Sequence, residues 1–275
     1  IFIVFFIVFL WAETKASEPI ISFWMFKNRL FASSQVLAFI YGATFVGLTI
    51  FIPIFVQAVY GGSAINAGII LMPMLLGSVV GSAFAGFAQS RMTYQKIMVI
   101  SVVVYSIGMI FMSTITPETS RLLLTIYMIL VGLGVGFSFS LLPSASVHKM
   151  DYRHRGSANS TNSFFRSLGL ALGITVFGSI QTKLLTNEIT DKLGASGNQA
   201  SNTVENLQTV FQPEQRAQIP SNILDVIVHA MSNSISATFL WSLIPIAIAV
   251  VAVYFMGNEK LEVPKKASSE RVLQD

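Results

Sequence analysis

The sequence predicts an all-α integral membrane protein whose six spanning helices form two inverted repeats of three. Hydrophobic residues make up 53% of the 275 residues and charged residues 11%, whereas soluble domains carry about 25% charged residues. Six apolar segments reach the roughly 20 residues needed to cross a bilayer. They lack the polar alternation of barrel strands, so they should be helices, which satisfy their own backbone groups in lipid. The segments are 33–58, 66–89, 97–115, 121–147, 157–184 and 237–256.

The chain opens with a shorter apolar run, residues 1–10. Ten residues do not span a bilayer. The run also lacks the basic start and small-residue cleavage site of a signal peptide. We expect it to be the end of a truncated spanning helix that begins upstream, followed by a cytoplasmic linker at 11–32.

Lysine and arginine are distributed unevenly among the connections. Twelve of the 17 basic residues fall in 11–32, in the two connections 90–96 and 148–156, and in the tail 257–275, and only four fall on the other side. Basic loops face the cytoplasm. The linker and the C-terminus are therefore predicted to be cytoplasmic in a multi-pass plasma-membrane protein, and the connection 186–236 extracellular.

The end of that connection, residues 222–231, has apolar residues at helical spacing. Two interpretations fit the pattern: a helix lying on the membrane surface, or an extension of the segment 237–256. We favour the extension.

An internal repeat relates the two halves of the chain. At an offset of 92 residues, three glycines of 66–89 align with three of 157–184, and at an offset of 90 a glycine and a proline of 33–58 align with a pair in 121–147. The aligned pairs are Gly77–Gly169, Gly81–Gly173, Gly86–Gly178, Gly42–Gly132 and Pro53–Pro143. The units are 33–116 and 117–256. Because each holds three helices, the second is inverted in the membrane, which is a transporter architecture.

Glycine is concentrated in four of the six segments. Segments 33–58, 66–89, 121–147 and 157–184 hold twelve glycines, 97–115 holds one and 237–256 none. Small residues let helices pack closely in lipid. We expect the four glycine-rich helices to form the packed core and the other two to face lipid.

Several stretches resemble a known family. They are Glu18-Pro-Ile-Ile-Ser-Phe-Trp-Met-Phe-Lys-Asn-Arg-Leu-Phe, Pro53-Ile-Phe-Val-Gln57, Gly61-Gly-Ser-Ala-Ile-Asn-Ala-Gly68, Leu71-Met-Pro73 and Asn162-Ser-Phe-Phe-Arg166-Ser-Leu-Gly169-Leu-Ala-Leu-Gly173. The chain resembles the C-terminal half of a 14-helix drug:proton antiporter (multidrug efflux permease) of the major facilitator superfamily. The family's cytoplasmic Gly-x3-Asp-Arg-x-Gly-Arg signature has an echo in which Gly86 and Arg91 match while Ser90 and Thr93 replace the Asp and the first Gly after it.

The resemblance implies proton-driven efflux of drugs or other amphipathic toxic compounds by alternating access. It implies no cofactor, the proton gradient being the energy source. It implies three partners: the lipid bilayer, a small lipophilic or cationic substrate, and a missing N-terminal half that carries the coupling carboxylates. The fragment alone should be inactive. Two alternatives remain open, a carrier for a narrow endogenous metabolite and a non-transporting membrane sensor or scaffold.

Arg166 is the one charged residue well inside a predicted helix. A charged side chain in the membrane is costly and usually functional. It could face a cavity and pair with a carboxylate of the other half, or it could serve helix packing.

Other polar and aromatic residues could line a substrate cavity, because aromatic and neutral polar groups suit bulky lipophilic or cationic compounds. The alternative is ordinary helix packing. The candidates are Gln35, Phe39, Phe45, Thr49, Gln57, Asn162 and Phe165. Pro53, Pro143, Gly86 and Arg91 are candidates for conformational roles, since proline interrupts the helix ladder.

Other function classes are not favoured. The chain has no cysteine, so disulfides, thiol catalysis and thiolate metal sites are excluded. The basic residues lie between apolar runs rather than in one patch, so no nucleic-acid partner is expected. The cluster of His148, Asp151 and His154 has no catalytic spacing, and we predict that the protein is not an enzyme.

Overall fold

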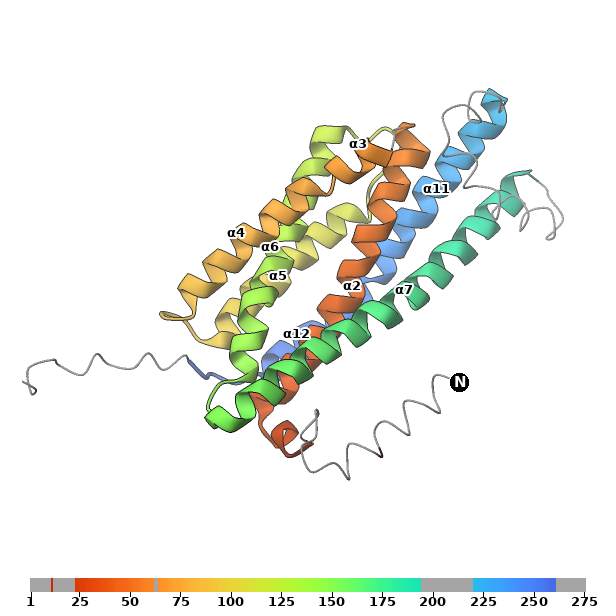
Figure 1. The fold of residues 1–275 in the computed structure, drawn as a ribbon. Helices are drawn as coiled ribbons and strands as arrows, with labels where there is room; N and C mark the ends of the chain where they lie inside the picture. The colour runs from red at the N-terminus through yellow and green to blue at the C-terminus, as the bar shows by residue number, and fades with distance from the viewer. Residues whose placement is uncertain (1–10, 12–22, 62–63, 194–219, 261–275) are drawn as a thin grey trace, which may run out of the picture.

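The computed structural model describes residues 11, 23–61, 64–193 and 220–260, and this part of the chain is a bundle of long helices without a β-strand (Figure 1). Six helical spans in it are long and apolar enough to cross a membrane. The elements are η1 (Phe23–Lys27), α2 (Arg29–Tyr60), α3 (Ala64–Ile69), α4 (Met72–Ala88), α5 (Tyr94–Met112), α6 (Arg121–Ser146), η2 (Tyr152–His154), α7 (Arg155–Leu193), α11 (Ser221–Trp241) and α12 (Leu243–Phe255). The prediction of an all-α membrane fold is confirmed. The predicted helix end at 1–10 lies outside the described residues.

Polar caps fix the starts of three spanning helices. Asn28 Oδ1 accepts a hydrogen bond from the Leu30 N–H at 2.9 Å at the start of α2. Thr93 and Ser120 cap α5 and α6 in the same way. Each cap satisfies a backbone N–H that has no partner inside its helix. The caps therefore place three helix starts within a few residues of the predicted ones.

Proline divides two of the predicted segments. The segment 66–89 consists of α3 and α4 with a turn at Ile70, because Pro73 has no N–H for the carbonyl of Ile69, where α3 ends. In the last span, Pro245 likewise offers no N–H to the carbonyl of Trp241, and α11 ends there. The periodicity of apolar residues did not reveal either interruption.

The connection predicted at 186–236 is shorter in the structure. Helix α7 continues to Leu193 and α11 begins at Ser221. Residues 223–255 form one apolar span, so the stretch 222–231 extends the last helix, as favoured from its spacing. Residues 194–219 lie outside the described part.

Two glycine-packed helix pairs join neighbouring helices closely, α2 with α7 and α4 with α6. Contrary to expectation, α4 and α7 do not lie in the interior, because they are the least buried of the six spans. A Cβ added to Gly42 on α2 would lie 2.3 Å from the carbonyl oxygen of Arg166 on α7. A Cβ on Gly132 of α6 would lie 2.1 Å from the carbonyl oxygen of Met74 on α4. Neither glycine can be replaced without separating the backbones.

The contacts of the two pairs correspond residue by residue. Gly42 maps onto Gly132 at the offset of 90, and Arg166 maps onto Met74 at the offset of 92. Two more glycine contacts per pair follow the same rule: Gly169 with Phe39 and Gly173 with Ala43 in one pair, Gly77 with Ile129 and Gly81 with Leu133 in the other. The inverted repeat read from the sequence is thus present in the backbone packing.

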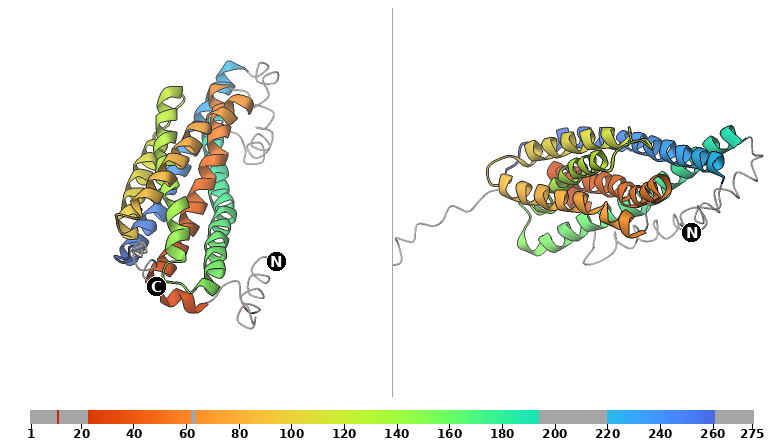
Figure 2. Two further views of the ribbon diagram at one scale, coloured as in Figure 1. Left: turned by 60° about the vertical axis from the view of Figure 1, so that its left-hand side comes forward. Right: turned by 90° about the horizontal axis from the view of Figure 1, so that it is seen from above.

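The remaining helices pack on α2 and α6. Helices α5 and α12 pack on each other, α5 packs on α6 and α12 on α2, and both lie on one side of α2 and α6 (Figures 1 and 2). Contrary to expectation, α5 also takes part in close packing, since a Cβ on Gly108 would lie 2.9 Å from the Val131 N. Its opposite face, which includes Val99 and Val103, is exposed, as expected of a helix at the lipid boundary.

Candidate functional site

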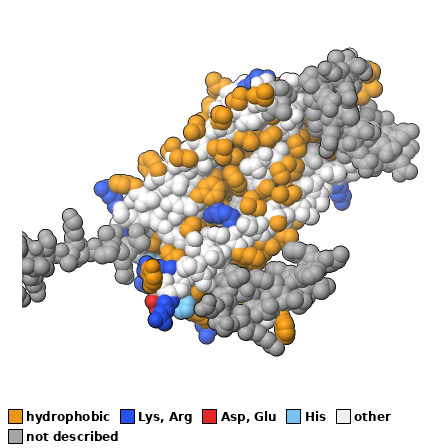
Figure 3. All heavy atoms as spheres, viewed as in Figure 1, with side chains coloured by type: hydrophobic (Ala, Val, Ile, Leu, Met, Phe, Trp, Pro, Cys, Tyr) orange, Lys and Arg blue, Asp and Glu red, His pale blue; other side chains and the backbone are white. Residues whose placement is uncertain are grey.

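Arg166 lies half-buried on α7, facing α6. Its Nη2 donates a hydrogen bond to the carbonyl oxygen of Ser138 at 3.2 Å, and its guanidinium carbon lies 4.6 Å from the ring centre of Phe139. Basic side-chain atoms are visible in the middle of an otherwise largely apolar face of the bundle (Figure 3). Within the described residues, Arg166 forms no ion pair. The guanidinium is thus held in place by a carbonyl and an aromatic face, with its charge uncompensated by this part of the chain.

Two aromatic rings extend the Arg166 site across three helices. Phe45 on α2 meets Phe139 on α6 edge-on, with ring centres 5.7 Å apart. Phe45 is half-buried and Phe139 is 36% exposed, so both rings have free surface. We call Phe45, Phe139 and Arg166 the central cluster. Phe139 was not among the predicted site residues, and only its place in the glycine-rich segment 121–147 could have marked it.

The structure places Gln35 and Asn162 in the packed interior. Gln35 Nε2 donates to Ser146 Oγ at 3.1 Å, and Asn162 Nδ2 donates to Gln35 Oε1 at 3.4 Å. All three residues are buried. This arrangement fits the packing interpretation, because the amides join α2, α6 and α7 rather than facing an open cavity.

Thr49, Pro53 and Gln57 follow one another along α2 beyond the central cluster. Thr49 Oγ1 donates to the Val46 carbonyl at 2.9 Å, and Gln57 Nε2 donates to the Pro53 carbonyl at 3.3 Å. Pro53 has no N–H for the carbonyl of Thr49, four residues earlier. Pro143 has the same relation to Phe139, so one proline interruption adjoins the central cluster.

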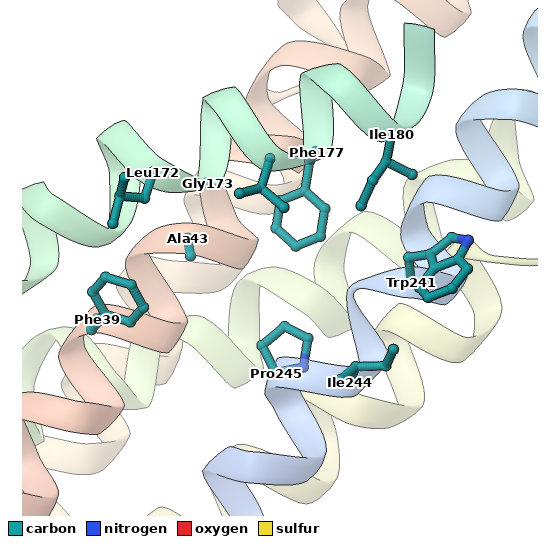
Figure 4. A pocket seen from close by; sticks show the side chains of 10 residues that line it. Phe39, Ala43, Leu172, Gly173, Phe177, Ile180, Trp241, Ile244 and Pro245 are labelled. Atoms are coloured by element: carbon teal, nitrogen blue, oxygen red, sulfur yellow. The ribbon is translucent and has the colours of Figure 1, made fainter. Parts of the chain in front are cut away.

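Phe39 and Phe165 lie apart from the central cluster. Phe39 lines an apolar pocket of about 300 Å³ between α2, α7 and the α11–α12 junction, together with Phe177, Trp241 and Pro245 (Figure 4). Phe165 packs on Phe26 of η1, with ring centres 5.9 Å apart. The predicted cavity residues therefore fall into separate groups, of which Phe45 and Arg166 share one.

The echo of the cytoplasmic signature lies at the end of α4. A Cβ on Gly86 would meet only Ser140 Oγ, at an ordinary 3.6 Å. The guanidinium of Arg91 lies 4.8 Å from the centre of the Phe87 ring and is exposed. The contact to α6 is made instead by the buried Gln89, whose Nε2 donates to Ser140 Oγ at 3.3 Å.

A buried tyrosine pair behind the central cluster was missed from the sequence. Tyr41 bonds to Ser101 at 2.8 Å, and Ser101 in turn donates to the Gly134 carbonyl. The Tyr105 hydroxyl donates to Thr44 Oγ1 at 2.9 Å, and the two tyrosine rings stack with centres 5.1 Å apart. Fully satisfied networks of this kind fix one arrangement of helices, here of α2, α5 and α6.

No group of three His, Asp or Glu side chains that could hold a metal ion occurs in the described residues. What the central cluster offers is a fixed positive charge, aromatic faces and apolar surroundings, which suit an organic ligand or a carboxylate of another segment.

Comparison with known proteins gives consistent matches. Residues 1–174 match the family model described as Major Facilitator Superfamily. The chain is 51% identical to multidrug resistance protein 3 of Bacillus subtilis over 98% of its own length and 54% of that protein. It is 29% identical to the multidrug transporter protein MdtP of the same organism, over 96% of this chain and 52% of the relative.

More distant matches agree on the fold. The vacuolar membrane amino acid uptake transporter fnx2 of Schizosaccharomyces pombe is 26% identical over 90% of this chain and 42% of its own length. The crystal structure of a bacterial homologue of the human lysosomal transporter Spinster superposes with a TM-score of 0.62 and 17% identity, over 88% of this chain and 52% of that one. The chain spans about half the length of these relatives. The chain belongs to the Major Facilitator Superfamily, whose members are membrane transporters and not enzymes.

Proposed function

We propose that this chain, together with an N-terminal half of the same polypeptide, exports drugs or other amphipathic organic compounds by alternating access driven by the proton gradient. The observation that carries the proposal is the central cluster, a fixed guanidinium beside two partly exposed aromatic rings on three helices. The names of the two Bacillus subtilis relatives support drug efflux. Aromatic faces and apolar surroundings bind many lipophilic shapes without a demanding hydrogen-bond pattern.

The proposed role of Arg166 is to pair with an acidic group of the N-terminal half. A charge inside the membrane is costly unless it is compensated, and the described part of this chain supplies no carboxylate to it. The acidic residues of the six spans lie near their extracellular ends: Glu188, Asp191 and Asp225. The groups that exchange protons at membrane depth therefore belong, in this proposal, to the N-terminal half.

In this proposal the end of the bundle formed by η1, η2 and the C-terminus of α12 lies in the cytoplasm of a plasma-membrane protein, because lysine and arginine are in excess there. Lys149 and Arg153 lie at that end, whereas Lys183 and Lys192 lie toward the opposite end of α7. Substrate would then leave toward the ends of α7 and α11 that flank residues 194–219.

A carrier for a narrow metabolite is the second candidate, favoured by the similarity to an amino acid uptake transporter. The two functions differ in breadth of substrate. An exporter of drugs accepts unrelated lipophilic cations, whereas a metabolite carrier accepts one chemical family.

Ethidium efflux tests the proposal. The polypeptide, extended upstream to its initiator methionine, is expressed in bacteria that lack their own efflux pumps, and ethidium fluorescence is followed with and without a proton uncoupler. The 275-residue chain alone serves as the control and should not export. Uncoupler-sensitive efflux by the extended polypeptide is the expected result. Absence of efflux despite normal membrane levels would contradict drug export and leave the metabolite carrier.

A further inference from the structure

A narrow groove lies between α5 and α12, on the side of the bundle away from the central cluster. It has a volume of about 200 Å³ and is lined mainly by valines, among them Val99, Val103 and Val250. Val99, Val103 and Val250 are each about half exposed, so the groove opens sideways at the boundary of the bundle. Gln95 and Tyr254 are its polar lining residues.

The polar residues stand at one end of the groove, at the membrane edge. Gln95 is the second residue of the span Tyr94–Met112, and Tyr254 is the second-last residue of the span Ile223–Phe255. Gln95 Nε2 donates to the carbonyl of Tyr254 at 3.1 Å, which ties the end of α12 to the start of α5. From Gln95 to Val103 the helix rises about 12 Å, which fits within one leaflet of a hydrocarbon core about 30 Å thick.

Two unpaired cations adjoin the polar end. Lys96 lies in the first turn of α5. The backbone of Lys260 forms an isolated antiparallel bridge with Thr93, the residue that caps the same helix. Both lysines are exposed, and neither forms an ion pair within the described residues. The N-terminus of α5 adds its own partial positive charge.

The nearby carboxylate does not cancel this charge. Glu259 Oε2 lies 2.6 Å from Lys149 Nζ and 3.5 Å from His148 Nε2. The hydrogen bond from Lys149 lowers the pKa of Glu259, so the carboxylate stays ionised and paired with the connection between α6 and α7. Lys96 and Lys260 remain free to meet an anion.

We propose that this groove binds one anionic phospholipid, with an acyl chain against the valines and the phosphate between Lys96 and Lys260. A basic site at the mouth of a groove between membrane helices is the chemistry that anionic headgroups select. The site is separate from the central cluster, so the proposal goes beyond the export function and does not depend on it. Bound lipid would bridge α5 and α12, one helix from each inverted repeat.

Lipid binding by the purified, delipidated chain tests this. Phosphatidylglycerol and phosphatidylcholine with identical acyl chains are titrated separately, and bound lipid is counted by native mass spectrometry. We expect one phosphatidylglycerol to bind more tightly than phosphatidylcholine. The double variant Lys96→Gln/Lys260→Gln should weaken the binding of phosphatidylglycerol about 30-fold, because each lysine contributes about a factor of five. The binding of phosphatidylcholine should not change.

A matched control removes two basic residues elsewhere, Arg121→Gln/Lys183→Gln, and should leave both lipids unchanged. Val103→Phe, which fills the groove at an exposed position, should weaken the binding of both lipids. The helical circular dichroism of this variant should match that of wild type, which shows that it still folds. Glycerol 3-phosphate, a soluble phosphate without an acyl chain, should not compete. The proposal would be overturned if the two lipids bound equally tightly, or if both double variants lost the same amount of phosphatidylglycerol affinity. Displacement of the lipid by ethidium would also overturn it.

Discussion

The α2–α7 pair and the α4–α6 pair have the same backbone contacts and different side chains. In both, a glycine of one helix lies against a carbonyl of the other, at positions related by the repeat. At the equivalent contact, α7 has the half-buried Arg166 and α4 has the fully buried Met74. Asn162 likewise corresponds to Ile70. The repeat thus preserves close packing in both copies, whereas the charge and the buried amide occur in only one.

This difference separates architecture from function. A Cβ added at these glycines would lie 2.1–2.8 Å from a backbone oxygen of the neighbouring helix. The glycines are therefore required by the packing of the helices. Arg166 and Met74 are equivalent in the two copies, and the carbonyl of each faces a glycine. The same backbone contact thus accommodates a charged side chain in one copy and a thioether in the other. A residue that differs between copies at a preserved contact is therefore a better functional candidate than a residue that merely is polar.

The largest expected effect comes from the glycine contacts. Gly42→Ala and Gly132→Ala should each lower the free energy of unfolding by at least the roughly 1–3 kcal/mol typical of overpacking, because the new methyl group meets a backbone oxygen. Gly178→Ala, which has open space around it, should cost nothing. Thermal melting in detergent, followed by circular dichroism, compares the three. The correspondence between the two helix pairs would be contradicted if Gly178→Ala lost as much stability as the other variants. It would also be contradicted if only one of Gly42→Ala and Gly132→Ala were destabilised.

A smaller effect is expected for the amide found in one copy only. Gln35→Leu removes the hydrogen bonds to Ser146 and Asn162 and leaves the buried Asn162 amide without its acceptor. Interhelical hydrogen bonds in membranes average about 0.6 kcal/mol and reach about 1.7, so we expect a loss of about 1 kcal/mol in the same melting assay. Thr125→Leu, at the equivalent position of the other copy, is the control, since Thr125 is only partly buried and its hydroxyl bonds to the Arg121 carbonyl of its own helix. A stable Gln35→Leu protein would show that the amide is not needed for packing.

The smallest effect concerns pH at the end of the bundle where Glu259 pairs with Lys149. Because the pKa of Glu259 is lowered in the folded chain, its contribution to stability is present above the ordinary glutamate pKa of about 4.3 and is lost as pH falls through the lowered value. The pair is partly exposed, so the contribution should be a few tenths of a kcal/mol. Melting wild type and Glu259→Gln at neutral and at acid pH measures it. The difference between the two proteins should shrink on acidification, and a difference that grows would contradict the assignment.

The sequence predicted the large features because lipid imposes them. Apolar length located the six spans, and the glycines of the repeat marked the helices that make close contacts. The helix interruptions before Pro73 and Pro245 were not predicted, because the sequence stays apolar through both of them. The site was harder to predict, because Gln35 and Asn162 are polar residues that suit a cavity, and only the structure shows that both are buried and bonded to each other. Phe139 could not be found without knowing which face of α6 meets Arg166.

The most direct test of the account is the replacement of Arg166 by the residue found in the other copy. Arg166→Met in the upstream-extended polypeptide should reach the membrane in normal amounts and melt no lower than wild type, because Met74 occupies the same backbone setting. Its uncoupler-sensitive ethidium efflux should fall at least about tenfold, while Met74→Leu, the matched control, exports normally. Efflux by Arg166→Met at the wild-type rate would show that the charge serves packing alone and that the transport site lies elsewhere.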